Sequence, residues 1–247
     1  MTKVKLICIP FAGGSKYAYQ SFNKFCPQTI ELITLELPGR GARHGERRLT
    51  DIASMVRDIF TQIKPYLSAR DNAIGIGNSY VLYGHSMGAL LVYELIKFIR
   101  AENLQLPMAL FLTGHGAPGT RIETSRHLLS KDEFINEIRS LGGSPEEVLQ
   151  DETLMLFFEP ILRADFEAIE TYEYEECEKF DIPITVVIGS HEETTQKEAK
   201  EWKEISDNEF ELLELPGKHF FIFEHAEKLM QLIVKKIHQY GRTIVLP

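Results

Sequence analysis

A serine flanked by two glycines is the feature of this sequence that most directly suggests covalent chemistry. Gly84-His85-Ser86-Met87-Gly88 matches the pattern G-x-S-x-G, and it follows an apolar run and precedes an amphipathic stretch. In that context the serine lies on a sharp turn between a strand and a helix, which lifts its hydroxyl out of the sheet. Glycines flank it because side chains there would collide with neighbouring backbone. We therefore predict that Ser86 is the nucleophile of a serine hydrolase.

The backbone around an attacked carbonyl must donate hydrogen bonds to the oxygen that becomes negative. One donor is the N–H of the residue after the nucleophile, here Met87. The second comes from a loop after an early strand, and Pro10-Phe11-Ala12-Gly13-Gly14-Ser15 follows the first apolar run of the chain. We expect the Ala12 N–H to be this second donor, with Phe11 as the neighbouring alternative. The spacing of the loop does not match a phosphate-binding P-loop.

A base must take the proton of the serine, and eight histidines compete for this role. In this class of enzyme the order along the chain is serine, acid, histidine. His219 follows the last apolar run and precedes a C-terminal helical pattern, so we assign it as the base. His225 and His238 lie within that helical pattern, where we expect solvated or packing roles. His85 lies inside the serine turn, and we expect it to support the turn.

The acid of such a triad is expected after the preceding strand. The apolar run 184–188 is followed by Gly189-Ser190-His191-Glu192-Glu193. We choose Glu192 as the acid, with Glu193 as the alternative. If the loop has no catalytic function, both are ordinary exposed glutamates on the surface. The loop after the run 108–113 has no acid directly in it, which favours the 189–193 loop. In the predicted mechanism the carboxylate fixes the imidazole tautomer of His219 while that ring accepts the proton of Ser86.

Short apolar runs alternate with helical patterns along the chain. Strands are predicted over residues 4–9, 32–37, 80–83, 108–113, 184–188 and 210–215, and helices over residues 52–66, 89–100, 196–205 and 225–240. The strands are rich in Val, Ile and Leu with little alternation, which is typical of a sheet covered by helices on both faces. Repeated strand-then-helix order indicates a mostly parallel sheet. With the serine turn, this predicts the α/β-hydrolase fold.

One region interrupts the alternation of strands and helices. Residues 130–178 are helical in pattern, acidic and aromatic, and contain no clear strand. Because loops at strand ends build the sites of such folds, we predict a helical lid over the site. An ordinary pair of packing helices is the alternative. The predicted organisation is a single domain over residues 1–247, with a helical lid subdomain inserted at residues 118–178.

Composition and charge narrow the class of protein. The 247 residues are 44% hydrophobic and 26% charged, as in a soluble globular protein. A net charge of −9 argues against a general nucleic-acid binder, since no broad face would neutralise phosphates. The odd number and wide spacing of the cysteines suggest neither disulfides nor a zinc site, and no window approaches a membrane helix. We expect a cytoplasmic protein that needs no cofactor and no metal.

Four motifs, in this order, resemble those of type II thioesterases, the stand-alone partners of nonribosomal peptide and polyketide synthases. They are Pro10-Phe11-Ala12-Gly13-Gly14, Leu37-Pro38-Gly39-Arg40-Gly41, Gly84-His85-Ser86-Met87-Gly88 and Gly217-Lys218-His219-Phe220-Phe221. The resemblance covers nearly the whole chain and extends to Trp202, where it implies a structural role. It implies hydrolysis of stalled or wrong acyl groups from the phosphopantetheine arm of a carrier protein.

The sequence departs from that family pattern in three places. Glu192 stands where the family usually has Asp, and its extra methylene requires a shifted loop. Lys218 stands where glycine is common. Residues 71–79 look like a longer loop before the serine strand.

Carrier proteins are typically acidic, so a chain of charge −9 needs a local basic patch to bind one. Four arginines cluster after the second predicted strand: Arg40, Arg43, Arg47 and Arg48. We predict that they steer the carrier or contact the phosphate of its arm; a solvated loop, with Arg40 held by the turn, is the alternative. Other functions compatible with the triad are a small-molecule carboxylesterase or an acyltransferase, and a non-catalytic binding protein would share only the fold.

Overall fold

The computed structural model describes residues 3–67, 79–120 and 124–243. Most of the predicted longer loop at 71–79 lies outside the described residues. In the part of the chain that is described, six strands form one sheet in the order β2-β1-β3-β4-β5-β6, and every neighbouring pair is parallel. The strands are β1 (Val4–Ile9), β2 (Ile30–Thr34), β3 (Tyr80–His85), β4 (Leu110–Thr113), β5 (Ile184–Gly189) and β6 (Phe210–Leu215). The predicted parallel sheet is confirmed.

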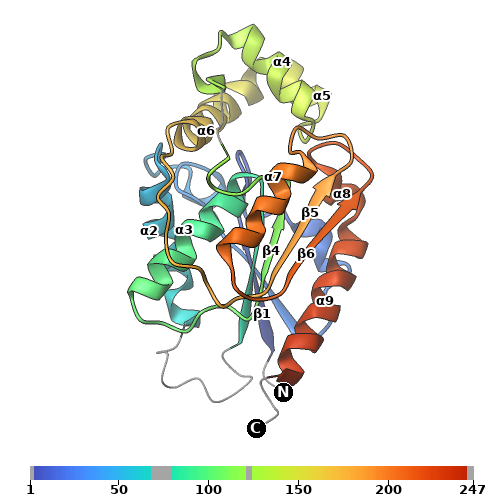
Figure 1. Ribbon diagram of the computed structural model, residues 1–247. Helices are drawn as coiled ribbons and strands as arrows, with labels where there is room; N and C mark the ends of the chain where they lie inside the picture. The colour runs from blue at the N-terminus through green and yellow to red at the C-terminus, as the bar shows by residue number, and fades with distance from the viewer. Residues whose placement is uncertain (1–2, 68–78, 121–123, 244–247) are drawn as a thin grey trace.

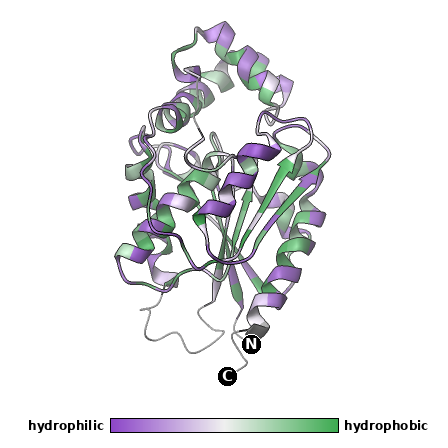
Figure 2. Cartoon of the chain, viewed as in Figure 1, coloured by the Kyte–Doolittle hydropathy of each residue, from purple (hydrophilic) through white to green (hydrophobic). Residues whose placement is uncertain are grey.

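Helices cover both faces of this sheet (Figure 1). One face packs against α2 (Ile52–Ile63), α3 (Met87–Ala101) and α7 (Gln196–Lys200). The other packs against α1 (Gln20–Asn23), α8 (Phe221–Glu224) and α9 (Ala226–Thr243). Successive residues of β1 serve opposite layers, with Ile7 in one core and Leu6 in the other. The central strands β3 and β5 are buried along their whole length and are mainly hydrophobic (Figure 2), as expected for a doubly covered sheet.

Several predicted boundaries differ from the structure for local reasons. The predicted strand 32–37 is displaced: β2 ends at Thr34, and Leu35 and Leu37 are buried in the helix-covered core without being strand residues. The helix predicted to run to residue 66 ends as α2 at Ile63 and tightens into a 3₁₀ turn over Lys64–Tyr66. Pro65 lies in that turn, and proline cannot continue the hydrogen-bond ladder of a helix.

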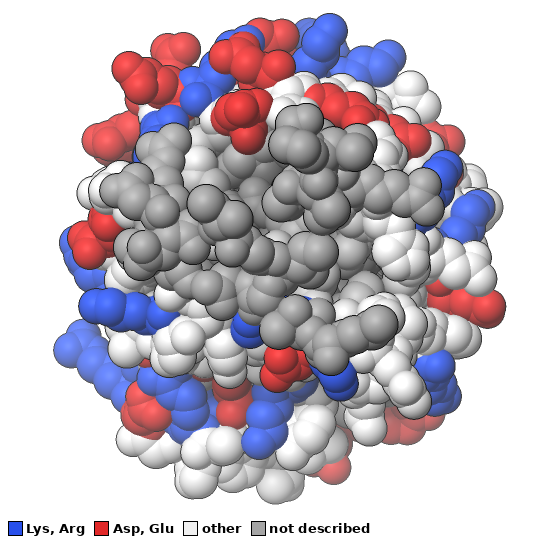
Figure 3. Space-filling model, turned by 90° about the horizontal axis from the view of Figure 1, so that it is seen from below, with Lys and Arg blue, Asp and Glu red and all other residues white. Residues whose placement is uncertain are grey.

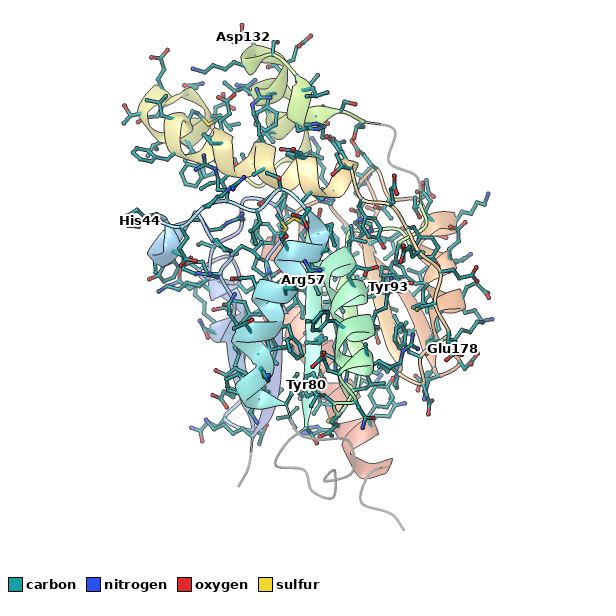
Figure 4. All side chains as sticks on the ribbon, turned by 90° about the vertical axis from the view of Figure 1, so that its left-hand side faces the viewer. His44, Arg57, Tyr80, Tyr93, Asp132 and Glu178 are labelled. Carbon is teal, nitrogen blue, oxygen red and sulfur yellow. The ribbon has the colours of Figure 1, made fainter. Side chains whose placement is uncertain are left out.

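Among the described residues, three α-helices lie above the sheet, between β4 and β5 in the chain. They are α4 (Lys131–Leu141), α5 (Glu146–Gln150) and α6 (Glu152–Glu170). Tyr80, which begins β3, lies low in the molecule, whereas Asp132 at the start of α4 lies at its top (Figure 4). The helices therefore cover the carboxyl ends of the parallel strands. On the opposite side, basic and acidic side chains both line the visible rim (Figure 3).

The strand order creates a crevice at the carboxyl ends of β1 and β3. From β1 the chain moves outward to β2, and it then returns past β1 to β3 and continues to the other edge. Connections on the two sides of such a reversal diverge, which leaves room for a ligand between them. The loops that follow β1 and β3 contain Ala12 and Ser86. Two segments that sequence analysis singled out therefore face the same crevice.

Candidate active site

Ser86 lies on a strained turn between β3 and α3. Its φ of 54° and ψ of −124° are uncommon for a residue with a side chain. A Cβ on Gly84 would lie 2.3 Å from the carbonyl oxygen of Gly88, and one on Gly88 would lie 2.7 Å from that of Ile9. The Ser86 N–H donates to the carbonyl oxygen of Thr113 at 2.8 Å, which anchors the turn to β4. The turn predicted from G-x-S-x-G is therefore present, with the glycines where backbone contact requires them.

Glu192 and His219 meet although 27 residues separate them in the chain. The Nδ1 of His219 lies 2.9 Å from Oε2 of Glu192, whose side chain is fully buried. The other oxygen, Oε1, accepts the N–H of Gly189 at 2.5 Å. Because a carboxylate only accepts, Nδ1 carries the hydrogen and Nε2 is left as a proton acceptor. The glutamate thus reaches the histidine despite its extra methylene.

Glu193, the alternative acid, has a different partner. Its side chain is 70% exposed and pairs with Arg126 at 2.8 Å. The geometry therefore selects Glu192 as the carboxylate that can orient His219.

Ser86, Met87 and His219 line one pocket of about 400 Å³, together with Phe11 and Ala12. Among the described residues, no hydrogen bond uses the N–H of Met87, which opens α3, or that of Ala12 or Phe11. Unpaired N–H groups beside a nucleophile can donate to an oxyanion. The structure thus brings every predicted site residue to this one pocket, with Glu192 directly behind His219.

The rest of the pocket wall is mainly apolar, and its apolar part comes largely from the helices above the sheet. Charged side chains also line the pocket, namely Arg126, Glu170, Glu193 and Glu198. The lining side chains from these helices include Ile138, Val148, Met155, Phe158, Leu162 and Phe166. Sequence analysis placed a lid in this region but named none of these residues. A mainly apolar wall around a few polar groups is the usual form of a small-molecule site.

His85 packs directly against His219. The two ring centroids are 4.9 Å apart, and His85 Nδ1 lies 3.0 Å from the Thr113 hydroxyl. Burial, reinforced by His219, holds the pKa of His85 well below its ordinary value, so its ring stays neutral. His85 therefore supports the turn, as predicted, and it also packs against the ring of His219.

Trp202 has the structural role that the resemblance implied. It is fully buried, and its indole N–H donates to the carbonyl oxygen of His115 at 2.9 Å. His115 belongs to the loop after β4 and lines the pocket. Trp202 thus holds a loop that lines the pocket, although it is not itself a lining residue.

Of the four arginines predicted to contact the carrier, Arg40 does not fit, and the prediction is wrong for this residue. Arg40 is only 2% exposed and pairs with the buried Asp165, so it cannot reach a partner protein. Arg43 is largely neutralised, because it pairs with Glu46 and Asp58 at 2.6 and 2.7 Å. Arg47 and Arg48 are exposed.

Asp165 was missed by sequence analysis. It lies on the apolar face of α6, one helical turn from Ile161, Leu162 and Ile169. A carboxylate on an apolar stripe is a signal that the sequence does contain, because burial there requires a partner.

Fold and site together define an α/β-hydrolase with a serine nucleophile turn. The family model for the thioesterase domain matches residues 4–237, so the chain belongs to the thioesterase family and is a thioester-hydrolysing enzyme. The predicted fold and the resemblance to type II thioesterases are confirmed.

Individual relatives agree with this assignment. The chain is 35% identical to the gramicidin S biosynthesis protein GrsT of Aneurinibacillus migulanus, over 95% of this chain and 89% of that protein. It resembles the structure of the type II thioesterase BorB from the borrelidin biosynthetic cluster, with 31% identity and a TM-score of 0.84 over 96% of this chain and 93% of BorB. It also resembles ClbQ from the colibactin pathway of nonribosomal peptide and polyketide synthases, with 26% identity and a TM-score of 0.88 over 98% of this chain and all of ClbQ.

No helix among the described residues is long and apolar enough to cross a membrane. No group of three His, Cys, Asp or Glu side chains in the described ranges could hold a metal ion.

Proposed function

We propose that this thioesterase hydrolyses acyl groups from the phosphopantetheine arm of carrier proteins in a nonribosomal peptide or polyketide synthase. The observation that carries the proposal is the convergence of Ser86 and the His219–Glu192 pair on one pocket with a mainly apolar wall. An apolar wall suits an acyl chain, and the site of a thioester carbonyl then lies beside the serine. The biosynthetic relatives support the carrier as the bearer of that thioester.

The chemistry follows from the arrangement of the polar groups. Ser86 Oγ attacks the thioester carbonyl carbon while His219 Nε2 takes the hydroxyl proton. The N–H groups of Met87 and Ala12 stabilise the resulting oxyanion. When the C–S bond breaks, the proton on His219 passes to the departing thiolate. Water then attacks the acyl-serine with His219 again as base, which releases the carboxylic acid and restores Ser86.

In this proposal α4, α5 and α6 act as the lid of the site. They supply most of the apolar wall, so the acyl group lies between them and the sheet. These helices exclude water from around the acyl chain, while the thioester carbonyl lies beside Ser86. Arg47 and Arg48 remain the predicted contacts for the acidic carrier.

Turnover of matched substrates tests the proposal. An acyl-loaded carrier protein and an oxygen ester of the same acyl group are compared at equal concentration, by mass spectrometry of the carrier and by acid release. We expect a higher kcat/KM for the carrier thioester, and we expect Ser86→Ala to lower kcat by at least about 10⁴-fold. Faster turnover of the oxygen ester would instead indicate a carboxylesterase. Equal labelling of wild type and Ser86→Ala by a fluorophosphonate would exclude Ser86 as the nucleophile.

A further inference from the structure

A buried ion pair links the lid to the loop that carries the second oxyanion donor. Arg40 donates two hydrogen bonds to Asp165, Nη2 to Oδ1 at 2.6 Å and Nη1 to Oδ2 at 2.7 Å. The side chains are 2% and 0% exposed. Asp165 belongs to α6, whereas Arg40 follows β2, so the pair joins the roof of the pocket to the edge of the sheet.

The same carboxylate also holds the loop after β1. Oδ2 of Asp165 accepts the N–H of Gly13 at 2.7 Å. The next N–H, that of Gly14, donates to the carbonyl oxygen of Phe11 at 2.8 Å and closes a turn over Phe11–Gly14. Gly13 has a φ of +75°, which suits the third position of a type II turn. Two of the three N–H groups after Phe11 are thus used to fix the turn, and that of Ala12 has no partner among the described residues.

Helix α6 also contacts this turn through an aliphatic side chain. A Cβ on Gly13 would lie 2.6 Å from Cδ2 of Leu162, one helical turn before Asp165. Leu162 lines the pocket as well. The turn is therefore held by the lid helix through a carboxylate and an aliphatic contact.

Stability alone does not explain a pair of this kind. Removing two charges from water costs several kcal/mol per ion, and well-packed apolar residues often replace such pairs without loss of stability. Moreover, the Nε of Arg40 is buried with no partner in the described part of the chain, so the pair is incompletely compensated. What the carboxylate provides, and an apolar residue could not, is an acceptor for the Gly13 N–H.

We propose that Asp165, oriented by Arg40, is a positioning residue for the oxyanion site: it fixes the Phe11–Gly14 turn so that the Ala12 N–H is aimed at the oxygen that becomes negative. The inference rests on the proposed function of Ser86 and Ala12. It adds that part of the catalytic apparatus is set by the lid. Donors aimed at the site of developing charge act only if they are fixed before the reaction.

The test replaces the ion pair by apolar residues of similar size, in the double variant Arg40→Met/Asp165→Leu, and compares it with Asp165→Asn. Asparagine keeps an oxygen for the Gly13 N–H, so it should be the milder change. The control is Glu159→Gln, which breaks an ion pair with Arg163 on the same helix at 2.8 Å but does not touch the turn. Urea unfolding establishes that each variant is folded.

The readout is the affinity for an alkylboronic acid, which needs no turnover. The Ser86 oxygen bonds to boron and its proton passes to His219, so a negative tetrahedral adduct fills the oxyanion site. We expect the double variant to bind it about 10- to 100-fold more weakly and to lose a similar factor in kcat with KM nearly unchanged. Asp165→Asn should lose only a fewfold, and Glu159→Gln nothing.

Two results would overturn the proposal: unchanged boronate affinity in the folded double variant, or equal losses in the double variant and in Glu159→Gln. Failure of the proposed function gives a different pattern. If the wild type bound the boronate but released no acyl group from a carrier, the carrier assignment would fall, and the graded boronate affinities would still decide the role of Asp165.

Discussion

The pocket has two halves that are built on different principles. The half borne by the strands contains tight turns whose glycines, such as Gly84 and Gly88, pack closely against neighbouring backbone. Its polar side chains have fixed partners, as in the His219–Glu192 pair. The half borne by α4 to α6 consists mainly of apolar side chains. The first turns of α6 also expose Leu156 and Phe157, which are 73% and 69% accessible. Chemistry needs fixed geometry, whereas binding an acyl chain needs only volume and apolar surface.

The largest effect should come from the acid, in the strand-borne half. Glu192→Gln keeps the shape of the side chain but can hold the wrong tautomer of His219. We expect kcat to fall on the order of 10³- to 10⁴-fold, with KM little changed. Thioester kinetics provide the measurement. The matched control is Glu193→Gln, which should stay within a fewfold of wild type; if the two variants were equally impaired, the assignment of Glu192 would be wrong.

The next effect concerns the place where the two halves touch. Gly143 has a φ of +113°, and a Cβ on this residue would lie 2.4 Å from the ring of Phe220, the residue after His219. Gly143→Ala should push the lid turn and this ring apart and lower kcat/KM about tenfold, or about 1.4 kcal/mol.

Gly142→Ala is the control for Gly143→Ala. Gly142 also has a positive φ, +76°, but a Cβ there would meet nothing within 4 Å. Steady-state kinetics and urea unfolding of both variants separate backbone strain from contact. If Gly142→Ala lowered kcat/KM as much as Gly143→Ala, the Phe220 contact would have no functional part.

A smaller effect is expected within the lid-borne half. Met155 lines the pocket and is 2% exposed, whereas its neighbour Leu156 is 73% exposed. Met155→Ala enlarges the pocket, so relative rates should shift about three- to tenfold toward longer acyl chains. A panel of acyl-pantetheine thioesters measures this shift. Leu156→Ala should leave the preference unchanged, and a shift in that variant alone would place the acyl chain outside the pocket.

The smallest effect is a pH dependence of stability from the strand-borne half. The folded protein keeps the pKa of His85 below its ordinary value, while the unfolded chain protonates near pH 6.5. The contribution of His85 to the free energy of unfolding is therefore fully present above about pH 6.5. It is lost as the pH falls toward the pKa of the folded state, by at most about 1.4 kcal/mol per pH unit.

The measurement is urea unfolding of wild type and His85→Gln between about pH 7.5 and pH 5, from about one unit above to about one and a half units below the pKa of histidine in the unfolded chain. The variant should lose stability less steeply as the pH falls, because glutamine takes up no proton. His115, whose pKa burial also lowers, remains in both proteins and contributes equally. Parallel curves for the two proteins would show that His85 is not the group responsible.

The same division explains what the sequence could predict. Ser86 and His219 could be proposed because local spacing and chain order mark their positions, and Glu192 because it lies three residues beyond Gly189 at a strand end. The structure places Ser86 and His219 on one pocket and Glu192 against His219. The six strands were recognisable from apolar runs, with errors only at ends such as 35–37, where burial continues after pairing stops.

Arg40 and Asp165 could not be understood in this way. They are 125 residues apart, so nothing local in either segment announces the partner. From the sequence, Arg40 is either one more charge of an arginine-rich loop or a residue held by its own turn, and neither interpretation identifies Asp165. A buried charge is explained by its partner, and partners across a lid are set by tertiary packing alone.

Pro160 divides α6 between its exposed first turns and its buried second half. Proline has no N–H to donate to the carbonyl of Leu156, so the two parts of the helix are coupled less tightly than a continuous ladder would couple them. Substitutions before residue 160 can therefore accumulate during evolution and suit a new acyl group without disturbing the anchor at Asp165. One scaffold could in this way be adapted to the products of many different synthases.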